Sequence, residues 1–420
     1  MDVRNKKVTI VGFGRSGSAI ANLVLQLGGI VRVSDSALKE KVAEAILQAN
    51  LKHDICFESD QHTKEFIKDS DVVVLSPGVR FDSKAVVWAK EEGIPCFSEI
   101  EFAWMFCKNP IIAVTGSNGK TTVSTLISQI LEYAGKKTCL CGNIGSPFSQ
   151  HVLSLSDGQI IVLEVSSFQL ESIEKFHAHV AVLLNCTQNH LDRHKDMNDY
   201  FQAKSRIFLN QIENDYAIVN FNDLRTKNMI SAICSKVIYF NDSIQLGKFP
   251  DENQNFLAAR CACRVFGVSD EDAGFVLKNF RGVEHRLEWV RSIDDVEFVN
   301  DSKATTPEAG RWALERASKP IVMICGGRDK NIDFTVLRDI VKLKVKKMVV
   351  IGESKNKIRD AFSDIVDVNL EDSLEGAILK SKELSSQGDC ILFSPMCTSF
   401  DMFLNFEERG KAYKEIVGNL

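Results

Sequence analysis

One short segment carries the residue types that bind phosphate. The apolar run 111–114 is followed by Gly116, Ser117, Asn118, Gly119, Lys120, Thr121 and Thr122. Glycines turn backbone N–H groups toward phosphate oxygens, a lysine reaches the outer phosphates, and a threonine hydroxyl at a helix start can hold Mg²⁺. Val114 stands where the common phosphate-loop pattern has its first glycine, so a polar turn with a chance lysine is the alternative. The coincidence of strand, loop, Lys-Thr pair and a helix predicted over 121–135 favours a phosphate loop.

A second glycine-rich turn lies near the N-terminus. It spans residues 12–17 (Gly-Phe-Gly-Arg-Ser-Gly), follows the run VTIV and opens a predicted helix over 16–28, and Asp35 ends the next apolar run. In a dinucleotide fold such glycines approach a pyrophosphate and the acid contacts a ribose hydroxyl. The pattern does not identify the nucleotide: NAD and other nucleoside diphosphates stay open, as does a plain strand-to-helix turn.

Acids, histidines and a lysine follow the phosphate loop at predicted strand ends. Glu164 closes the run IIVLE, His190, Asp192 and His194 follow the run VAVLL, and Lys204 lies in the next predicted helix. Alternation of His190, Asp192 and His194 could indicate zinc, but a phosphate loop calls for Mg²⁺ with oxygen ligands. The shared position after the loop favours a metal and phosphate site.

The last third of the chain has its own polar segments at predicted strand ends. They are 285–286 (His-Arg), 301–306 (DSKATT), 326–330 (GGRDK) and 394–410 (SPMCTSFDMFLNFEERG). Ligands bind at the carboxyl ends of parallel strands in such folds, although each loop alone could be a solvated turn.

These residues require parallel sheets to position them. Short β-branched runs bounded by Gly, Pro, Asn or Ser alternate with helix-length segments almost throughout, which predicts an α/β fold. Breaks in the pattern near residues 98 and 283 predict three domains. They are a Rossmann-like domain over 1–98, a phosphate-loop ATPase-type sheet over 99–282 and a Rossmann-like domain over 283–420.

Composition excludes several classes of protein. The chain has 420 residues, 45% apolar and 25% charged, with a net charge of -5, which excludes a disordered chain, a fibre or a polytopic membrane protein. There is no global basic field for nucleic acid. Twelve cysteines lack CxxC spacing, which argues against a disulfide framework or zinc ribbon. With no secretory segment or membrane span expected, the sequence predicts a cytoplasmic protein.

The ordered set of motifs resembles the Mur ligase family over essentially the whole chain. The motifs are VTGSNGKTT, GNIG (142–145), EVSSFQLE, NHLDRH, AKSRI, HR, NDSKAT, GGRDK and SPMCTSFDMFLNFEERG. SSFQLE and SFDMFLNFEERG favour the branch that adds D-glutamate. The resemblance implies an enzyme of peptidoglycan precursor synthesis, and so of cell-wall formation, cell shape and division. ATP would phosphorylate the carboxylate of UDP-N-acetylmuramoyl-L-alanine, and the amine of D-glutamate would attack the acyl phosphate.

The resemblance also implies roles around ATP and its metal ions. Lys120 would hold the β- and γ-phosphates. Two Mg²⁺ ions are expected, with Thr121, Glu164, His190 and a carbamylated Lys204 as ligands. The remaining ATP contacts implied are Asn255 at adenine, Arg286 at phosphate and Asp301 at ribose.

For the other substrates the resemblance implies a further set of residues. Ser16, Asp35 and Ser36 would hold the UDP moiety, and Asn143 would contact the acceptor. The positions around D-glutamate and the acyl phosphate are Lys303, Thr305, Lys330, Ser399 and Phe406. The resemblance favours a monomer, and charge and hydropathy predict neither a nucleic-acid nor a membrane partner.

Two departures from the family pattern stand out, and three alternatives remain. The adenine-side motif GxHNxxNxxAA appears as FPDENQNFLAA, where Asn255 matches the second asparagine, and DSKATN ends in Thr306. A sibling ligase or a folylpolyglutamate synthetase-like enzyme would differ in amino acid or acceptor. A nicotinamide-dependent oxidoreductase would leave Lys120 and Lys204 without a role. The third alternative is a catalytically inactive nucleotide-binding regulator. Against it, every expected phosphate and metal position holds a residue type that can perform the catalytic role.

Overall fold

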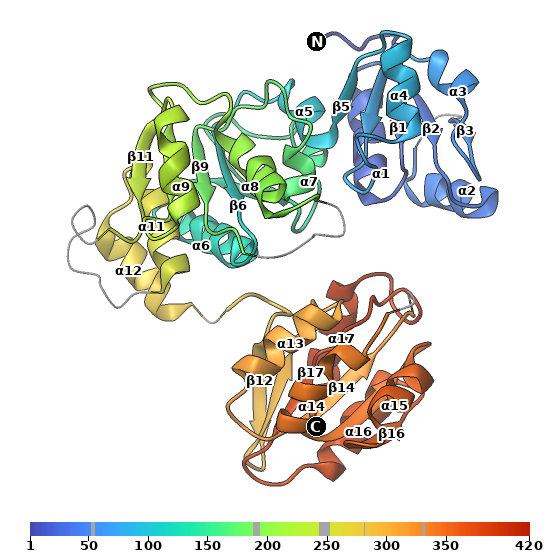
Figure 1. Ribbon diagram of the computed structural model, residues 1–420, viewed down its shortest axis with the longest axis vertical. Coiled ribbons are helices and arrows are strands. Elements are labelled where there is room, and N and C mark those ends of the chain that lie inside the picture. The colour runs from blue at the N-terminus through green and yellow to red at the C-terminus, as the bar shows by residue number, and fades with distance from the viewer. Residues whose placement is uncertain (52–54, 188–193, 243–252, 281, 330–331) are drawn as a thin grey trace. The chain divides into compact units, whose positions relative to one another are not determined.

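A computed structural model describes residues 1–420 except 52–54, 188–193, 243–252, 281 and 330–331. The chain divides into two compact units, 1–280 and 281–420. Each unit is built mainly from parallel strands with covering helices, which confirms the predicted α/β fold class (Figure 1). Across the described residues, no helix is both long and apolar enough to cross a membrane.

The first sheet of unit 1 is fully parallel, in the order β3-β2-β1-β4-β5. Its strands are β1 (Lys7–Val11), β2 (Ile30–Ser34), β3 (Cys56–Glu58), β4 (Val72–Leu75) and β5 (Cys96–Ser98). The helices are α1 (Arg15–Gln26), α2 (Lys39–Gln48), α3 (Lys64–Lys68) and α4 (Lys84–Glu91). The β-branched residues of β1 and β4 are buried on both faces, as parallel strands between helices require.

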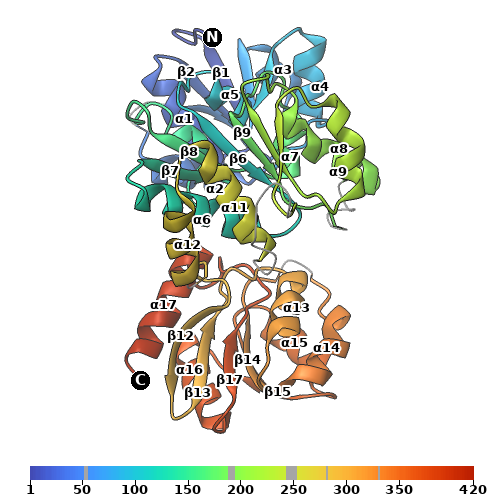
Figure 2. The same cartoon turned by 90° about the vertical axis from the view of Figure 1, so that its left-hand side faces the viewer.

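The second sheet of unit 1 has the order β11-β10-β9-β6-β8-β7. Its strands are β6 (Ile111–Thr115), β7 (Thr138–Gly142), β8 (Ile160–Glu164), β9 (Val180–Leu183), β10 (Tyr216–Val219) and β11 (Lys236–Tyr239). The helices are α5 (Glu99–Trp104), α6 (Lys120–Tyr133), α7 (Ser167–Leu170), α8 (Met197–Ser205), α9 (Leu224–Met229), α11 (Gln254–Val265) and α12 (Asp270–Asn279). Figure 2 shows α6 and α11 against one face of this sheet, where they bury an apolar core with β6, β8 and β9.

One apolar core joins the two sheets of unit 1. It runs from Val8 of β1 and Ile20 of α1 through Phe102 of α5 and Phe148 of the 3₁₀ turn η1 (Phe148–Gln150) to Ile161 of β8. The two sheets therefore pack as one body.

Unit 2 holds a six-stranded sheet in the order β12-β13-β17-β14-β15-β16. Its strands are β12 (Glu288–Ile293), β13 (Val296–Asn300), β14 (Ile321–Gly326), β15 (Val345–Ile351), β16 (Asp367–Leu370) and β17 (Cys390–Phe393). The helices are α13 (Pro307–Arg316), α14 (Arg338–Lys344), α15 (Lys355–Phe362), α16 (Leu374–Leu384) and α17 (Phe406–Gly418). Two apolar cores, one on each face, fix the helices to the sheet. Strand β12 is antiparallel to β13, so this sheet is mixed, which the sequence pattern did not reveal.

Candidate active site

The phosphate loop joins the buried strand β6 to helix α6. Gly119 is the N-cap of α6 with φ 85°, and no side chain caps the helix there, so its first N–H groups can face an anion. Lys120 Nζ donates to the carbonyl oxygens of Gly116 (2.9 Å) and Ser117 (3.2 Å). A Cβ on Gly119 would lie 2.5 Å from Asn255 Oδ1. The structure thus places Asn255, expected at adenine, directly against the loop.

A pair of residues after strand β9 clamps this loop. Asn185 Oδ1 accepts from the backbone N–H of Asn118 (3.0 Å), and Asn185 Nδ2 donates to the Asn118 carbonyl (3.1 Å). Ser117 Oγ donates to the Thr187 carbonyl and accepts from the Thr187 N–H, both at 3.0 Å. Sequence reasoning missed Asn185 and Thr187. The sequence signal was that Asn185 and Thr187 directly follow the apolar run VAVLL. The strand formed by this run lies beside β6, which leads into the phosphate loop.

Glu164 ends β8 beside the start of the loop, because Val114 of β6 is its register partner. Its side chain is 2% exposed. Its Oε1 accepts from Asn143 Nδ2 at 2.7 Å, whereas Oε2 is buried without a hydrogen-bond partner in the described part of the chain. A buried carboxylate oxygen left unpaired is unfavourable unless a cation faces it. With Thr121 buried in the first turn of α6, this oxygen donor set fits Mg²⁺.

Lys204 on α8 is buried next to the phosphate loop. Its Nζ donates to the Gly116 carbonyl (3.1 Å) and lies 4.4 Å from the centre of the Tyr200 ring. Burial, together with the charge of Lys120, lowers the pKa of Lys204 to about 7. The structure therefore brings Lys204, Lys120 and Glu164 to one loop, while His190 lies outside the described residues.

His194 is held by neighbouring polar side chains of unit 1. It is buried, its Nε2 is 3.0 Å from Ser167 Oγ, and its two ring nitrogens lie 3.5 and 3.4 Å from carboxylate oxygens of Glu171 and Asp199. The zinc alternative also needs His190 and Asp192, which lie outside the described residues. Where the chain is described, no group of three His, Cys, Asp or Glu side chains is arranged to hold a metal ion.

A cavity of about 430 Å³ opens beside the glycine-rich turn of the first sheet. It brings together three predicted site residues, since Ser16, Asp35 and Asn143 all line it. Helix α1 begins there at an N-cap without a side-chain cap or an acid in its first turn, which suits an anion. The cavity does not include Ser36.

Asp35 makes contacts that the sequence did not predict. Its Oδ2 accepts from the Phe13 N–H (2.6 Å) and its Oδ1 from the Ala37 N–H (2.8 Å). The carboxylate therefore holds the glycine-rich turn in place. A Cβ on Gly17 would lie 2.4 Å from the Gly12 carbonyl oxygen, which explains the glycine at that position.

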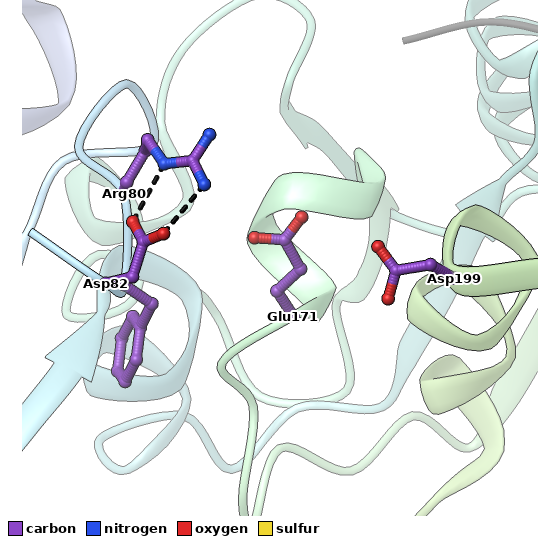
Figure 3. A pocket seen from close by; sticks show the side chains of 5 residues that line it. Arg80, Asp82, Glu171 and Asp199 are labelled. Carbon is purple, nitrogen blue, oxygen red and sulfur yellow. Dashed lines mark hydrogen bonds and ion pairs between the residues drawn. The ribbon is translucent and has the colours of Figure 1, made fainter. Parts of the chain in front are cut away.

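A second cavity of about 330 Å³ in unit 1 is lined by charged side chains. Arg80 and Asp82, after β4, form a two-pronged ion pair at 2.8 and 2.7 Å. The carboxylates of Glu171 and Asp199 face the space opposite this pair (Figure 3). Because Glu171 and Asp199 also contact His194, we interpret these acidic side chains as support for His194.

In unit 2, Asp301 follows β13 and is 3% exposed. It accepts from Ser394 Oγ (2.8 Å) and from the Leu287 N–H (3.2 Å). Burial raises the pKa of Asp301 to about 7. The guanidinium of Arg286 lies over the Trp312 ring at 4.7 Å.

Arg409, which sequence reasoning missed, joins two of the segments that hold predicted D-glutamate positions. Arg409 is 2% exposed and donates to Ser302 Oγ (3.1 Å), Ser302 O (2.8 Å) and Cys397 O (3.1 Å). It thus ties the segment after β13, which holds Lys303 and Thr305, to the segment after β17, which holds the buried Ser399. Lys303 Nζ lies 5.8 Å from the Phe406 ring centre. Lys330 lies outside the described residues.

Comparisons with known proteins cover the whole chain. Three family models match it: the Mur ligase MurD-like N-terminal domain over 6–98, the Mur ligase middle domain over 114–276, and the Mur ligase glutamate ligase domain over 285–397. The UDP-N-acetylmuramoylalanine--D-glutamate ligase of Alkaliphilus metalliredigens is 37% identical, with coverage of 100% of this chain and 99% of the relative. The protein of the same name from Caldicellulosiruptor bescii is 38% identical with the same coverage.

Solved structures share the fold. UDP-N-acetylmuramate-alanine ligase MurC from Thermotoga maritima aligns with a TM-score of 0.56 at 18% identity, covering 99% of both chains. MurF ligase from Thermotoga maritima in complex with ADP aligns with a TM-score of 0.56 at 15% identity, covering 100% of this chain and 96% of that one. At these identities the likeness concerns the fold alone.

Proposed function

The chain belongs to the Mur ligase family, and we propose that it uses ATP to join D-glutamate to UDP-N-acetylmuramoyl-L-alanine in peptidoglycan precursor synthesis. The observation that carries the chemistry is the grouping at one phosphate loop of Lys120, Lys204 and a Glu164 oxygen that has no hydrogen-bond partner among the described residues. The choice of D-glutamate is supported by relatives of that name over the full chain length.

The reaction joins two anions, so its barrier is mainly electrostatic. The alanyl carboxylate attacks the γ-phosphorus of ATP, the bond to ADP breaks, and an acyl phosphate forms. The amine of D-glutamate then attacks the acyl carbon, and phosphate leaves. Lys120 and the N-terminal end of α6 would supply positive charge to the transferring phosphoryl group.

The metal ions belong to the same proposal. Thr121, Glu164, His190 and a carbamylated Lys204 would hold two Mg²⁺ ions, which when bound neutralise phosphate charge. Formation of a carbamate requires a neutral amine, and burial favours that form of Lys204. The carbamate would replace a buried cation by an anion that suits Mg²⁺.

The substrate contacts are proposed residue by residue. Ser16, Asp35 and Ser36 would hold UDP, and Asn143 the acceptor, supported by the cavity that three of them line. Asn255, Arg286 and Asp301 would contact ATP. The D-glutamate and acyl-phosphate set is Lys303, Thr305, Lys330, Ser399 and Phe406. We further propose a cytoplasmic monomer with domains at 1–98, 99–282 and 283–420.

The test is ATP-dependent phosphate release with UDP-N-acetylmuramoyl-L-alanine as acceptor. D-glutamate is compared with L-glutamate, L-alanine and meso-diaminopimelate. Release only with D-glutamate is expected. Release with another amino acid would move the protein to a sibling ligase, and no release with any of them would contradict the enzyme proposal.

A further inference from the structure

Asn300 and His285 are buried together in unit 2, and the proposed function assigns neither of them a role. Asn300 ends β13 and is 0% exposed, while His285, in the turn before β12, is 3% exposed. The Nδ1 atom of His285 lies 2.9 Å from Asn300 Nδ2. The residues that follow them in the chain, Asp301 and Arg286, are both proposed ATP contacts, so the pair adjoins that part of the site.

The turn that contains His285 has a strained backbone. His285 (φ 63°) and Leu287 (φ 45°) both lie in the left-handed region, on either side of Arg286. Residues other than glycine keep this conformation only where surrounding contacts hold them there. The His285 N–H donates to Glu288 Oε2 (2.9 Å), and the His285 carbonyl accepts from the Lys303 N–H (3.0 Å). The contacts of His285 therefore help to set the direction in which Arg286 leaves the backbone.

The partners of the Asn300 amide fix which of its ends faces the imidazole. Its Oδ1 accepts from the Ser302 N–H (3.1 Å). Its Nδ2 lies 3.1 Å from Glu288 Oε2 and 3.2 Å from the Gly410 carbonyl oxygen, which are both acceptors, so the amide nitrogen belongs on that side. The same nitrogen meets His285 Nδ1, and because an amide nitrogen donates and does not accept, Nδ1 carries no proton. The ring proton of the neutral imidazole is then on Nε2.

Helix α17 leaves little room for the imidazole to move. A Cβ on Gly410 would lie 2.2 Å from His285 Nδ1, so any side chain there would displace the ring. The ring of Phe406, a proposed D-glutamate position, meets the imidazole edge to face, with the ring centres 6.4 Å apart. His285 thus contacts a segment of the proposed D-glutamate site as well as the turn of Arg286.

The charged groups around His285 come from its own turn, from β12 and from α17. Burial lowers the pKa of His285, and the positive charge of Lys414 acts in the same direction. The carboxylates of Glu284, Glu288 and Glu407 act in the opposite direction. The neutral imidazole that the hydrogen-bond pattern requires is therefore also the form that burial favours.

We propose that Asn300 is a positioning residue, which fixes His285 as the neutral tautomer that carries its proton on Nε2. His285 in this form holds the turn that presents Arg286 to ATP, and it holds the backbone of Lys303 for D-glutamate. An imidazolium, or the tautomer with its proton on Nδ1, would place two donors against each other and loosen the turn. The consequence for the substrates rests on the proposed function, because the roles of Arg286 and Lys303 come from it. The tautomer does not depend on that function.

The first experiment determines the tautomer in the full-length protein without measuring activity. Long-range ¹H–¹⁵N spectra of protein labelled with ¹⁵N-histidine distinguish protonated from unprotonated ring nitrogens. The signals of His285 are identified by their absence from the spectrum of His285→Gln. We expect an unprotonated Nδ1 and a protonated Nε2 at pH 7. A proton on Nδ1 at this pH would overturn the proposal.

Asn300→Asp tests whether the amide sets the tautomer. Aspartate keeps an oxygen for the Ser302 N–H but replaces the amide donor by an acceptor. We expect Nδ1 of His285 to be protonated at pH 7 in this variant, because it then faces a carboxylate. An unprotonated Nδ1 in the folded variant would show that Asn300 does not control the tautomer.

The second experiment compares KM values by phosphate release. Asn300→Asp should raise the KM for ATP and for D-glutamate by about tenfold or more. The KM for UDP-N-acetylmuramoyl-L-alanine should stay unchanged, because the acceptor cavity lies in unit 1. Gly410→Ala, which crowds the imidazole while Asn300 is intact, should show the same pattern and provides the test if Asn300→Asp does not fold.

The matched control is Ser373→Ala, which removes the side-chain cap of α16 in unit 2 and does not touch the turn. It should leave all three KM values unchanged. Equal changes in the three KM values of Asn300→Asp, or no change in any of them, would overturn the positioning role. A parent protein without ligase activity would refute the proposed function and leave the tautomer result standing.

Discussion

Replacement of Asp301 by asparagine should stabilise unit 2 at alkaline pH. The carboxyl is buried, and its pKa is raised from 3.8 to about 7 because burial disfavours the charged form. Each pKa unit corresponds to about 1.4 kcal/mol, so ionisation of Asp301 in the folded state costs about 4 kcal/mol at pH 8 and above. Asparagine keeps an oxygen that can accept from Ser394 or Leu287 and carries no charge.

The direction in which the stability contribution of Asp301 changes with pH follows from proton linkage. Between pH 3.8 and about 7 the folded state binds more protons at Asp301 than the unfolded state does. The contribution of Asp301 to stability is therefore fully present below pH 3.8 and is lost as the pH rises through 7. The stability difference between Asp301→Asn and the parent protein should grow from near zero at pH 4 to at most about 4 kcal/mol at pH 8.5.

The assay is urea unfolding followed by tryptophan fluorescence at pH 4.5, 6, 7 and 8.5. Replacement of Trp88 and Trp104 by phenylalanine leaves the two unit 2 tryptophans, Trp289 and Trp312, as reporters. The matched control is Asp389→Asn. Asp389 is also buried in unit 2, but its carboxylate is paired with Lys346 at 2.7 Å, so loss of its charge should destabilise. If Asp301→Asn destabilised unit 2 equally at pH 6 and pH 8.5, the burial argument would be wrong.

Three further predictions concern the phosphate loop. Lys120→Ala should lower kcat by about 100-fold or more, measured by phosphate release, and a near-normal kcat would refute the loop assignment. Lys204→Ala should be inactive and partly rescued by short carboxylates, whereas full activity without rescue would contradict the metal role. Asn185→Ala should raise the KM for ATP, because the clamp on Asn118 is lost; an unchanged KM in an ATP titration would show that the clamp is dispensable.

The sequence predicts those parts of the site whose residues are consecutive in the chain. The loop from Gly116 to Thr122 joins a buried strand to a helix, so pattern and chemistry coincide in one segment. The α/β class follows in the same way from alternating strands and helices. Strand β12 was not predicted because none of its residues is fully buried at the edge of the sheet, next to the break near residue 283.

Contacts between distant segments could not be predicted, because they depend on strand order and register. Asn185 reaches Asn118 only because β9 lies beside β6. Asn143 meets Glu164 because Gly142 is the register partner of Glu164 in the β7–β8 pair. Arg409 donates to Ser302 because α17 packs against β13, although the two are more than a hundred residues apart. None of these relations is encoded in a local run of residue types.

Two buried glutamates in unit 1 distinguish scaffold from site by a physical criterion. Glu101 of α5 is 0% exposed, and its carboxylate accepts three backbone N–H groups, from Glu174 (3.0 Å), Lys175 (2.8 Å) and Phe176 (2.9 Å). Glu164 is almost equally buried, yet one of its oxygens has no partner in the described part of the chain. A buried carboxylate whose oxygens accept hydrogen bonds stabilises the turn that donates them. A buried carboxylate oxygen without a hydrogen-bond partner lowers the stability of the fold. The Glu164 oxygen without a hydrogen-bond partner among the described residues lies at the end of the strand beside the phosphate loop, where a bound cation would offset its charge.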